Sequence, residues 1–192
     1  MPSMEATEVD PLARILVSSW LATALYSHQF REEYDSPPTT IAKAHHFRSV
    51  VQARVNQGER YALHPEFMEF GRVQVTDTSL GANYLIRSMS AVSIEENFAK
   101  RDQIGLFEVS RAFGISLLPY RFERTGMQLW VCGTKQARDS RRLIPAGELN
   151  HVGFWTYDDN LDPGPGGPVF DQGDLDPWDE LGDEPDIDGF AL

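Results

Sequence analysis

The residues best placed to do chemistry lie in the segment 158–192, where acidic and bulky apolar side chains are interleaved. This acidic segment carries twelve Asp and Glu residues and no Lys or Arg, whereas residues 1–157 carry 17 acidic and 17 basic side chains. The whole formal charge of -12 therefore lies in the acidic segment. Its carboxylates can steer a basic partner from a distance, and its apolar side chains can then make short-range contacts. The apolar residues expected to contact a partner are Phe170, Trp178, Leu181, Ile187 and Phe190.

This pattern predicts recruitment of a partner rather than a reaction. We expect the acidic segment to bind a protein with a basic, partly apolar groove and to become ordered on binding. Proline and glycine dominate residues 161–168, which exclude a regular helix or strand and predict a linker. The simpler alternative is a solvated segment that only keeps the protein soluble, but solubility would not require Trp178 or two phenylalanines.

Basic side chains are concentrated in residues 100–142, which carry nine Lys and Arg against four Asp and Glu. They could bind phosphate groups, receive the acidic segment of the same chain, or simply be solvated. Trp130, Tyr120, Phe122 and Tyr84 lie in or near this region and could stack on unpaired bases. The candidate residues for binding nucleic acid or the acidic segment are Arg121, Arg124, Lys135, Arg138, Arg141 and Arg142.

A nucleic-acid-binding protein is therefore the second hypothesis, with an acidic segment that competes for the basic surface. In physical design, though in no motif, the chain resembles single-strand DNA-binding proteins whose acidic tails end in hydrophobic residues and recruit partners. The residues that carry this resemblance are the last seven, Asp186 to Leu192.

A metal-dependent, nuclease-like enzyme is the third hypothesis. It requires Glu66, Glu69 and Asp77 to meet in one cleft, since clustered carboxylates are typical magnesium ligands. Ordinary surface carboxylates are the simpler interpretation. The adjacent His45 and His46 would point about 100 degrees apart on a helix and rarely chelate one ion together. We predict no catalytic residue, metal ligand or cofactor.

The elements that position these residues begin with two helices. Asp10 and Pro11 suit a helix start, and apolar residues recur at helical spacing from Leu12 to Leu25. So broad an apolar stripe predicts a helix central to the core or to a homodimer interface. A Pro-Pro pair ends this helix, and a second helix should begin after Thr39 or Thr40 and end at Gly58.

Alternating apolar residues then predict two β-hairpins, one around residues 73–86 and one that joins residues 115–122 to 127–132. In the second, Gly126 should supply the left-handed conformation of a tight loop. Pro119 lacks an N–H donor and predicts an edge strand or a bulge. Residues 152–157 read as the last strand.

The predicted fold class is α+β: N-terminal helices packed on a mostly antiparallel sheet built from hairpins, followed by a disordered acidic C-terminal tail. The domains are residues 1–157 and 158–192. Cys132 is the single cysteine, which excludes an internal disulfide and favours the cytoplasm. We expect no membrane span, because the longest apolar stretch is too short. The 14 arginines against 3 lysines indicate GC-rich coding sequence and a bacterial or phage origin.

Overall fold

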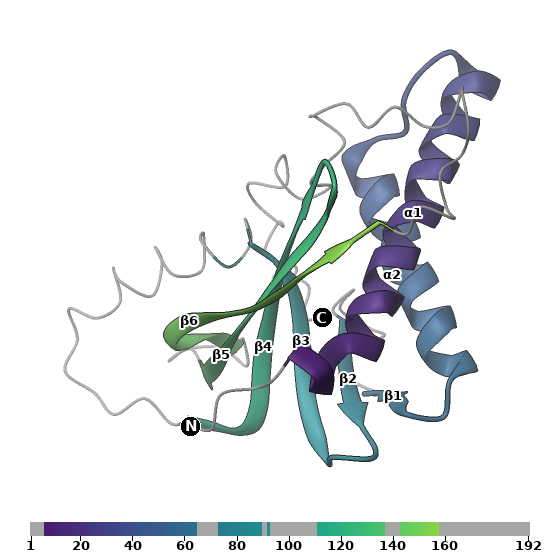
Figure 1. Cartoon of the computed structure of the whole chain (residues 1–192). Helices are drawn as coiled ribbons and strands as arrows, with labels where there is room; N and C mark the ends of the chain where they lie inside the picture. The colour runs from purple at the N-terminus through teal and green to yellow at the C-terminus, as the bar shows by residue number, and fades with distance from the viewer. Residues whose placement is uncertain (1–5, 65–72, 90–91, 93–110, 137–142, 158–192) are drawn as a thin grey trace, which may run out of the picture.

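The computed structural model describes residues 6–64, 73–89, 92, 111–136 and 143–157. Two helices precede the strands along the chain and lie against one face of the sheet (Figure 1). The elements are α1 (Ala6–Tyr34), α2 (Thr40–Gln57), β1 (Tyr61–Leu63), β2 (Val73–Asp77), β3 (Ala82–Ser88), β4 (Arg111–Glu123), β5 (Gly126–Gln136) and β6 (Leu143–Thr156). This arrangement confirms the α+β class, whereas the predicted disorder of residues 158–192 falls outside the described residues.

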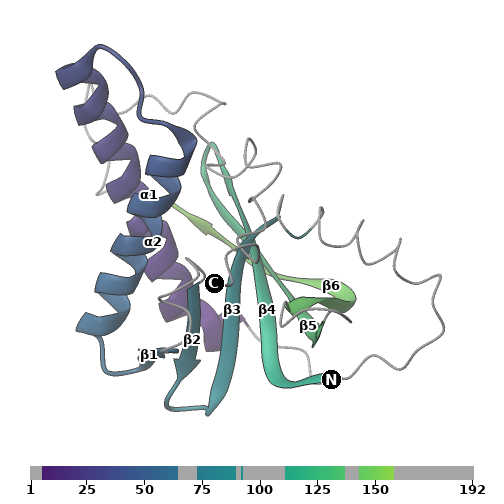
Figure 2. The ribbon, with the colours of Figure 1, turned by 180° about the vertical axis from the view of Figure 1, so that it is seen from behind.

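The described strands form one six-stranded sheet that follows chain order from β1 to β6. Neighbouring strands are antiparallel except for β3 and β4, which are parallel. Seen from behind, β1 and β2 lie beside the helices, and β5 and the start of β6 lie farthest from them, whereas the end of β6 crosses back to α1 (Figure 2). The mostly antiparallel sheet and both hairpins, β2–β3 and β4–β5, are therefore confirmed.

Two details of the strands differ from the sequence prediction. Pro119 lies in an interior strand, and the β4–β5 register continues from Leu117 to Glu123 without a shift. A strand residue directs its N–H toward one neighbour only, so one proline removes a single ladder bond. β6 starts at Leu143, well before the expected residue 152. Gly147 of β6 has a φ of 88° and lies where the β5–β6 register shifts, so it forms a bulge within the strand.

Gly126 acts differently from the prediction. Its φ is not positive, and the loop contains only Arg124 and Thr125 between the paired Glu123 and Gly126. A Cβ atom at position 126 would lie 2.2 Å from the backbone oxygen of Trp155 on β6. Glycine is required here because β6 passes close to the turn.

The helix ends follow the local chemistry of the chain. The Thr39 hydroxyl accepts a hydrogen bond from the Ala42 N–H, and Gly58 donates to the Val55 carbonyl, as expected for the caps of α2. Asp35 has a φ of 51° and ends α1. The predicted start of α1 was wrong, because Asp10 lies within the helix. Its carboxylate accepts from Arg14 and Trp155, which lowers its pKa.

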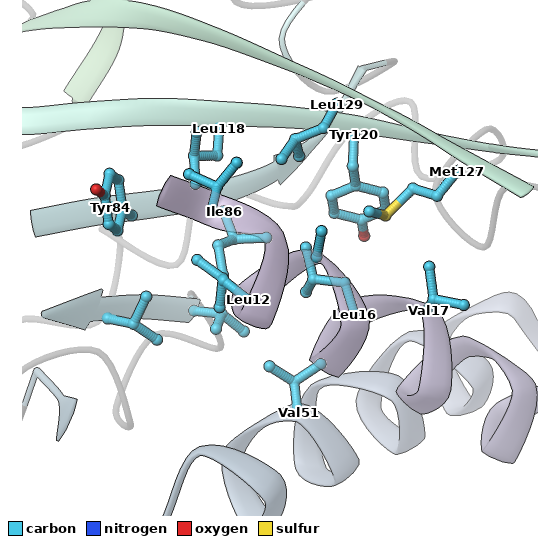
Figure 3. Close-up of a cluster of buried hydrophobic side chains, with 14 of the residues drawn as sticks. Leu12, Leu16, Val17, Val51, Tyr84, Ile86, Leu118, Tyr120, Met127 and Leu129 are labelled. Atoms are coloured by element: carbon cyan, nitrogen blue, oxygen red, sulfur yellow. The ribbon is translucent and has the colours of Figure 1, made fainter. Parts of the chain in front are cut away.

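The main core lies between the helices and the sheet (Figure 3). Trp20 of α1 stacks on Phe122 of β4, with ring centroids 4.5 Å apart and planes 10° apart. Phe47 of α2 meets the same Phe122 ring edge-on at 5.8 Å. Other buried members include Leu12, Leu16, Val17, Val51, Tyr84, Ile86, Leu118, Tyr120, Met127 and Leu129. These contacts fix the orientation of β4 and β5.

A smaller apolar cluster consists of Leu85, Val92, Leu117 and Cys132. Each of its strand residues is adjacent in sequence to a residue of the main core, so the cluster lies on the opposite face of the sheet. Cys132 is buried there as a free thiol. Neither α1 nor α2 is both long and apolar enough to cross a membrane.

Candidate binding surface on strands β4 to β6

Alternation along β4 separates core residues from a potential binding surface. Tyr120 and Phe122 are 2% and 3% exposed on the helix side, whereas the Arg121 side chain between them is 51% exposed. Successive strand residues point to opposite faces of a sheet, so Arg121 projects away from the helices. The hairpin thus presents a cation on the face that α1 and α2 leave uncovered.

Trp130 of β5 lies beside this arginine. The Arg121 guanidinium carbon is 5.7 Å from the centre of the Trp130 ring system, within cation–π range. His151 of β6 is paired with Trp130 in the sheet register, and their rings meet edge-on at 5.6 Å. Trp130 is partly buried, and His151 is exposed. Three adjacent strands therefore contribute one cationic, one indole and one imidazole group to a continuous surface.

Arg121, Gln128 and Phe154 are cross-strand neighbours on β4, β5 and β6, and the apolar Phe154 lies on the edge strand. Glu123 Oε1 accepts hydrogen bonds from Arg121 Nη2 and Gln128 Nε2, each 2.7 Å long. Phe154 is paired with Gln128 and is 42% exposed. These bonds hold the arginine while its aromatic neighbours remain accessible, so the surface offers both charge and stacking area.

The end of β6 fixes where the acidic segment begins. The Tyr157 N–H donates to the Thr125 carbonyl at 3.1 Å, and the Tyr157 hydroxyl donates to the Glu123 carbonyl at 2.8 Å. Burial raises the pKa of this phenol, which keeps the hydroxyl protonated as a donor. Residue 158 therefore follows directly from an anchor beside the β4–β5 turn, whose Arg124 is exposed.

The structure divides the predicted basic group. Arg121 and Arg124 lie at the turn end of the hairpin. Lys135 lies near the opposite end of β5, paired with Arg111 and Ile144. Seven residues of strand separate Lys135 from Gln128, the partner of Arg121, or about 23 Å at the usual rise. Eight of the predicted site residues lie outside the described residues: Arg138, Arg141, Arg142, Phe170, Trp178, Leu181, Ile187 and Phe190.

Only one of the four aromatic residues suggested as stacking platforms is accessible. Tyr84, Tyr120 and Phe122 are at most 3% exposed and belong to the main core, so that part of the hypothesis is wrong. They occupy core positions because their strand alternation places them under the helices. Trp130 points to the opposite face of the sheet and is only partly buried, so its ring is accessible for stacking. His151 and Phe154 were missed, because their alignment with Trp130 depends on bulges in the β5–β6 ladder.

Asp77 does not present a free carboxylate for a metal. It is fully buried and accepts hydrogen bonds from Arg60 Nε at 2.9 Å and from the Ser79 hydroxyl at 2.6 Å. Burial alone would raise its pKa, but these hydrogen bonds together outweigh burial and lower it. Glu66 and Glu69 lie outside the described residues. Within the described ranges, no three His, Cys, Asp or Glu side chains are grouped to hold a metal ion.

His46 has an interhelical role. Its Nδ1 lies 3.2 Å from the Thr23 hydroxyl, and its ring stacks on Tyr26 at 4.3 Å with planes 5° apart. Burial lowers the pKa of His46 and favours the neutral ring. These contacts join α1 to α2, so packing of the helices accounts for this histidine.

Charge is also distributed unevenly within residues 1–157. Residues 111–157, which span β4 to β6, contain seven Lys and Arg and three Asp and Glu. Residues 1–110 contain ten basic and fourteen acidic side chains. Residues 111–157 are thus positive by four as a stretch of sequence, and they directly precede the acidic segment.

Comparison with known proteins gives no significant match to a family model, a curated protein or a solved structure.

Proposed function

We propose that this chain is a non-enzymatic binding or regulatory protein that recruits a protein partner through its acidic segment. The observation that carries this proposal is the confinement of the net charge to residues 158–192, together with the bulky apolar side chains among those carboxylates. The carboxylates steer a basic partner, and Phe170, Trp178, Leu181, Ile187 and Phe190 insert into apolar parts of its groove. A cytoplasmic setting accords with the single buried thiol of Cys132.

The hydrogen bonds of Tyr157 support a separation between the folded residues and the acidic segment that binds the partner. All the helices and strands described lie within residues 6–156, and the two Tyr157 hydrogen bonds fix the last described residue to the β4–β5 turn. A segment that starts from a fixed point can present its side chains to a partner without disturbing the main core.

Capture experiments with three forms of the chain test the proposal. The full chain should retain basic protein partners in a salt-sensitive manner, and a chain ended at Tyr157 should not. A third form, with Phe170, Trp178 and Phe190 replaced by Ser, keeps every carboxylate and separates steering from apolar contact. We expect it to lose most of the retained partner. Full binding by the chain ended at Tyr157, checked for an unchanged melting temperature, would contradict the proposal.

A second candidate function is single-stranded nucleic-acid binding by β4 to β6. The exposed Arg121 beside Trp130 favours it, because aromatic stacking contributes about 1–3 kcal/mol per base and arginine contacts phosphates. In this case the acidic segment competes with nucleic acid for the surface. A chain ended at Tyr157 should bind labelled oligothymidine more tightly than the full chain does. Absence of binding at low salt would exclude this function.

Self-association through the N-terminal helix is a further partner hypothesis. The first turns of α1 are used by the main core, since Leu12 and Leu16 are fully buried. Its later turns leave Leu25 47% and Tyr34 57% exposed. A homodimer contact on α1 would therefore use these later turns.

A further inference from the structure

The turn end of the β4–β5 hairpin carries a mixed cationic and aromatic surface whose side chains come from three strands. We call it the hairpin-end surface and define it by Arg121, Arg124, Gln128, Trp130, His151 and Phe154. The acidic residue beside it is Glu123, which already accepts hydrogen bonds from Arg121 and Gln128. Such a surface suits a ligand that combines carboxylates with aromatic or aliphatic groups.

We propose that the hairpin-end surface binds acidic peptide segments that contain aromatic residues, and that its occupant in the isolated protein is the chain's own residues 158–192. This inference rests on the proposed function, because it assigns a second, intramolecular binding site to the same acidic segment. The consequence is competition: an external partner must displace the segment from the hairpin-end surface.

Charge complementarity is the first argument for this occupant. Residues 111–157 are positive by four, and the acidic segment has twelve negative charges and no positive one. Arg121 and Arg124 can pair with its carboxylates, whereas Glu123 opposes them and limits the affinity. A modest affinity is what a displaceable contact needs.

The second argument is reach. The acidic segment directly follows Tyr157, which donates hydrogen bonds to the Thr125 and Glu123 carbonyls. His151, the strand partner of Trp130, lies six residues before Tyr157, or about 20 Å along β6 at the usual rise. Phe170 lies thirteen residues after Tyr157, and a chain of that length can extend roughly 45 Å. The segment can therefore fold back over Trp130 without strain in its linker.

The third argument is effective concentration. A short flexible linker holds its ligand near the site at an effective concentration on the order of millimolar. Occupancy in the same molecule is then substantial even when the free peptide would bind with a dissociation constant of about 1 mM or somewhat less. Exposed pairs and a partly exposed indole can supply this affinity without a deep pocket.

The chemistry of the contact follows from the geometry of the platform. Arg121 already lies over Trp130, so a carboxylate that pairs with this guanidinium lies close to the indole. Phe154, on the edge strand, offers 42% of its surface to an aromatic side chain of the segment. Phe170 or Trp178 would pack there while the acidic residues around them engage Arg121 and Arg124.

Nuclear magnetic resonance on the full chain tests the contact directly. The comparison form is a full chain in which every Asp and Glu of residues 158–192 is replaced by Asn or Gln. We expect the indole N–H signal of Trp130 and the amide signals of Arg121 and His151 to differ between the two forms. The buried Trp20 is the internal control and should not change. High salt should shift the natural chain toward the neutral form, and identical Trp130 signals would overturn the inference.

A competition measurement separates this inference from the proposed function. Poly-L-arginine serves as a basic probe for the acidic segment of the full chain. Exchange of both Arg121 and Arg124 for Glu should tighten its binding by about two- to tenfold, since the internal competitor surface is lost. The matched control exchanges the exposed Arg14 and Arg31 of α1 for Glu, which changes the net charge equally. Any tightening of poly-L-arginine binding in this control measures the effect of net charge alone, and we expect it to be smaller.

The two experiments fail in distinguishable ways. If the Trp130 signals change but no form captures a basic protein partner, the intramolecular contact stands and the proposed function is wrong. If partners are captured but both pairs of substitutions have equal effects on poly-L-arginine binding, the proposed function stands and the intramolecular contact is wrong.

Discussion

Two arginine–carboxylate pairs of nearly equal length lie in opposite halves of this sheet and differ in their surroundings. The Arg60 Nη2–Asp77 Oδ2 distance is 2.8 Å, and the Arg121 Nη2–Glu123 Oε1 distance is 2.7 Å. The Asp77 side chain is 0% exposed, whereas that of Glu123 is 33% exposed. The same chemical pair is therefore part of the interior in one place and part of a binding surface in the other.

The partners of each pair show what the difference means. Arg60 also donates to the Glu8 carbonyl, and Asp77 also accepts from Ser79, so this pair joins α1, the start of β1 and the β2–β3 turn. Arg121 instead lies against Trp130, with half of its side chain in solvent. Burial and the number of joined elements separate a structural pair from one that is available to a ligand.

Among changes to the two ion pairs, the largest expected effect is loss of the buried carboxylate. Asp77→Ala should lower the free energy of unfolding by about 3 kcal/mol, since it leaves Arg60 and the β2–β3 turn without their acceptor. Glu123→Ala should cost no more than about 1 kcal/mol, as expected for an exposed pair. Urea denaturation of both variants measures the difference, and equal losses would break the comparison.

The pH dependence of the same variants gives an independent control. The pKa of Asp77 is lowered in the folded protein, so its contribution is present above the unfolded value near 3.9 and is lost as pH falls through the folded value. The natural chain should lose its advantage over Asp77→Ala in that acidic range. An advantage that stays constant with falling pH would show that Asp77 stabilises the fold through packing rather than through its charge.

An intermediate effect is expected where β6 crosses the turn that bears the exposed pair. Gly126→Ala would place a Cβ 2.2 Å from the Trp155 oxygen and 2.8 Å from the Phe154 ring, and should cost roughly 1–3 kcal/mol. Gly58→Ala is the matched control, since its Cβ would meet nothing closer than 3.7 Å. Equal melting temperatures for the two variants would show that β6 can move away from the turn.

The smallest effect should come from the exposed arginine itself. Arg121→Ala removes an exposed ion pair and a cation–π contact, which together contribute about 1 kcal/mol. Tyr120→Ala, one residue away on the core face, should cost several times more, or about 3–5 kcal/mol. Thermal denaturation that ranks these two variants in the reverse order would overturn the assignment of the two faces.

Local sequence signals were sufficient for much of this fold. The caps at Thr39 and Gly58 and the two hairpins depend on neighbouring residues only, so they were predictable. Sidedness was less well predicted. Leu25 belongs to the apolar stripe predicted for the first helix but is 47% exposed.

The binding surface depends on relations that sequence spacing does not contain. The Trp130–His151 pair lies between two register shifts of the β5–β6 ladder, and the β3–β4 pair is parallel across a long connection. Arg121 and Lys135 are both basic, but the length of β5 separates them. Composition predicted the positive charge of this region, and only the strand register could place the individual residues.

The parallel pairing of β3 with β4 also bears on how the chain reaches its folded state. Every β3–β4 pair, such as Asn83 with Ile115, joins residues 32 positions apart, whereas each antiparallel ladder includes a pair no more than 12 positions apart. Closing a longer loop costs more entropy and slows the contacts that depend on it. The two antiparallel halves, β1 to β3 and β4 to β6, can therefore assemble separately, and their docking along β3 and β4 should form the main kinetic barrier to folding.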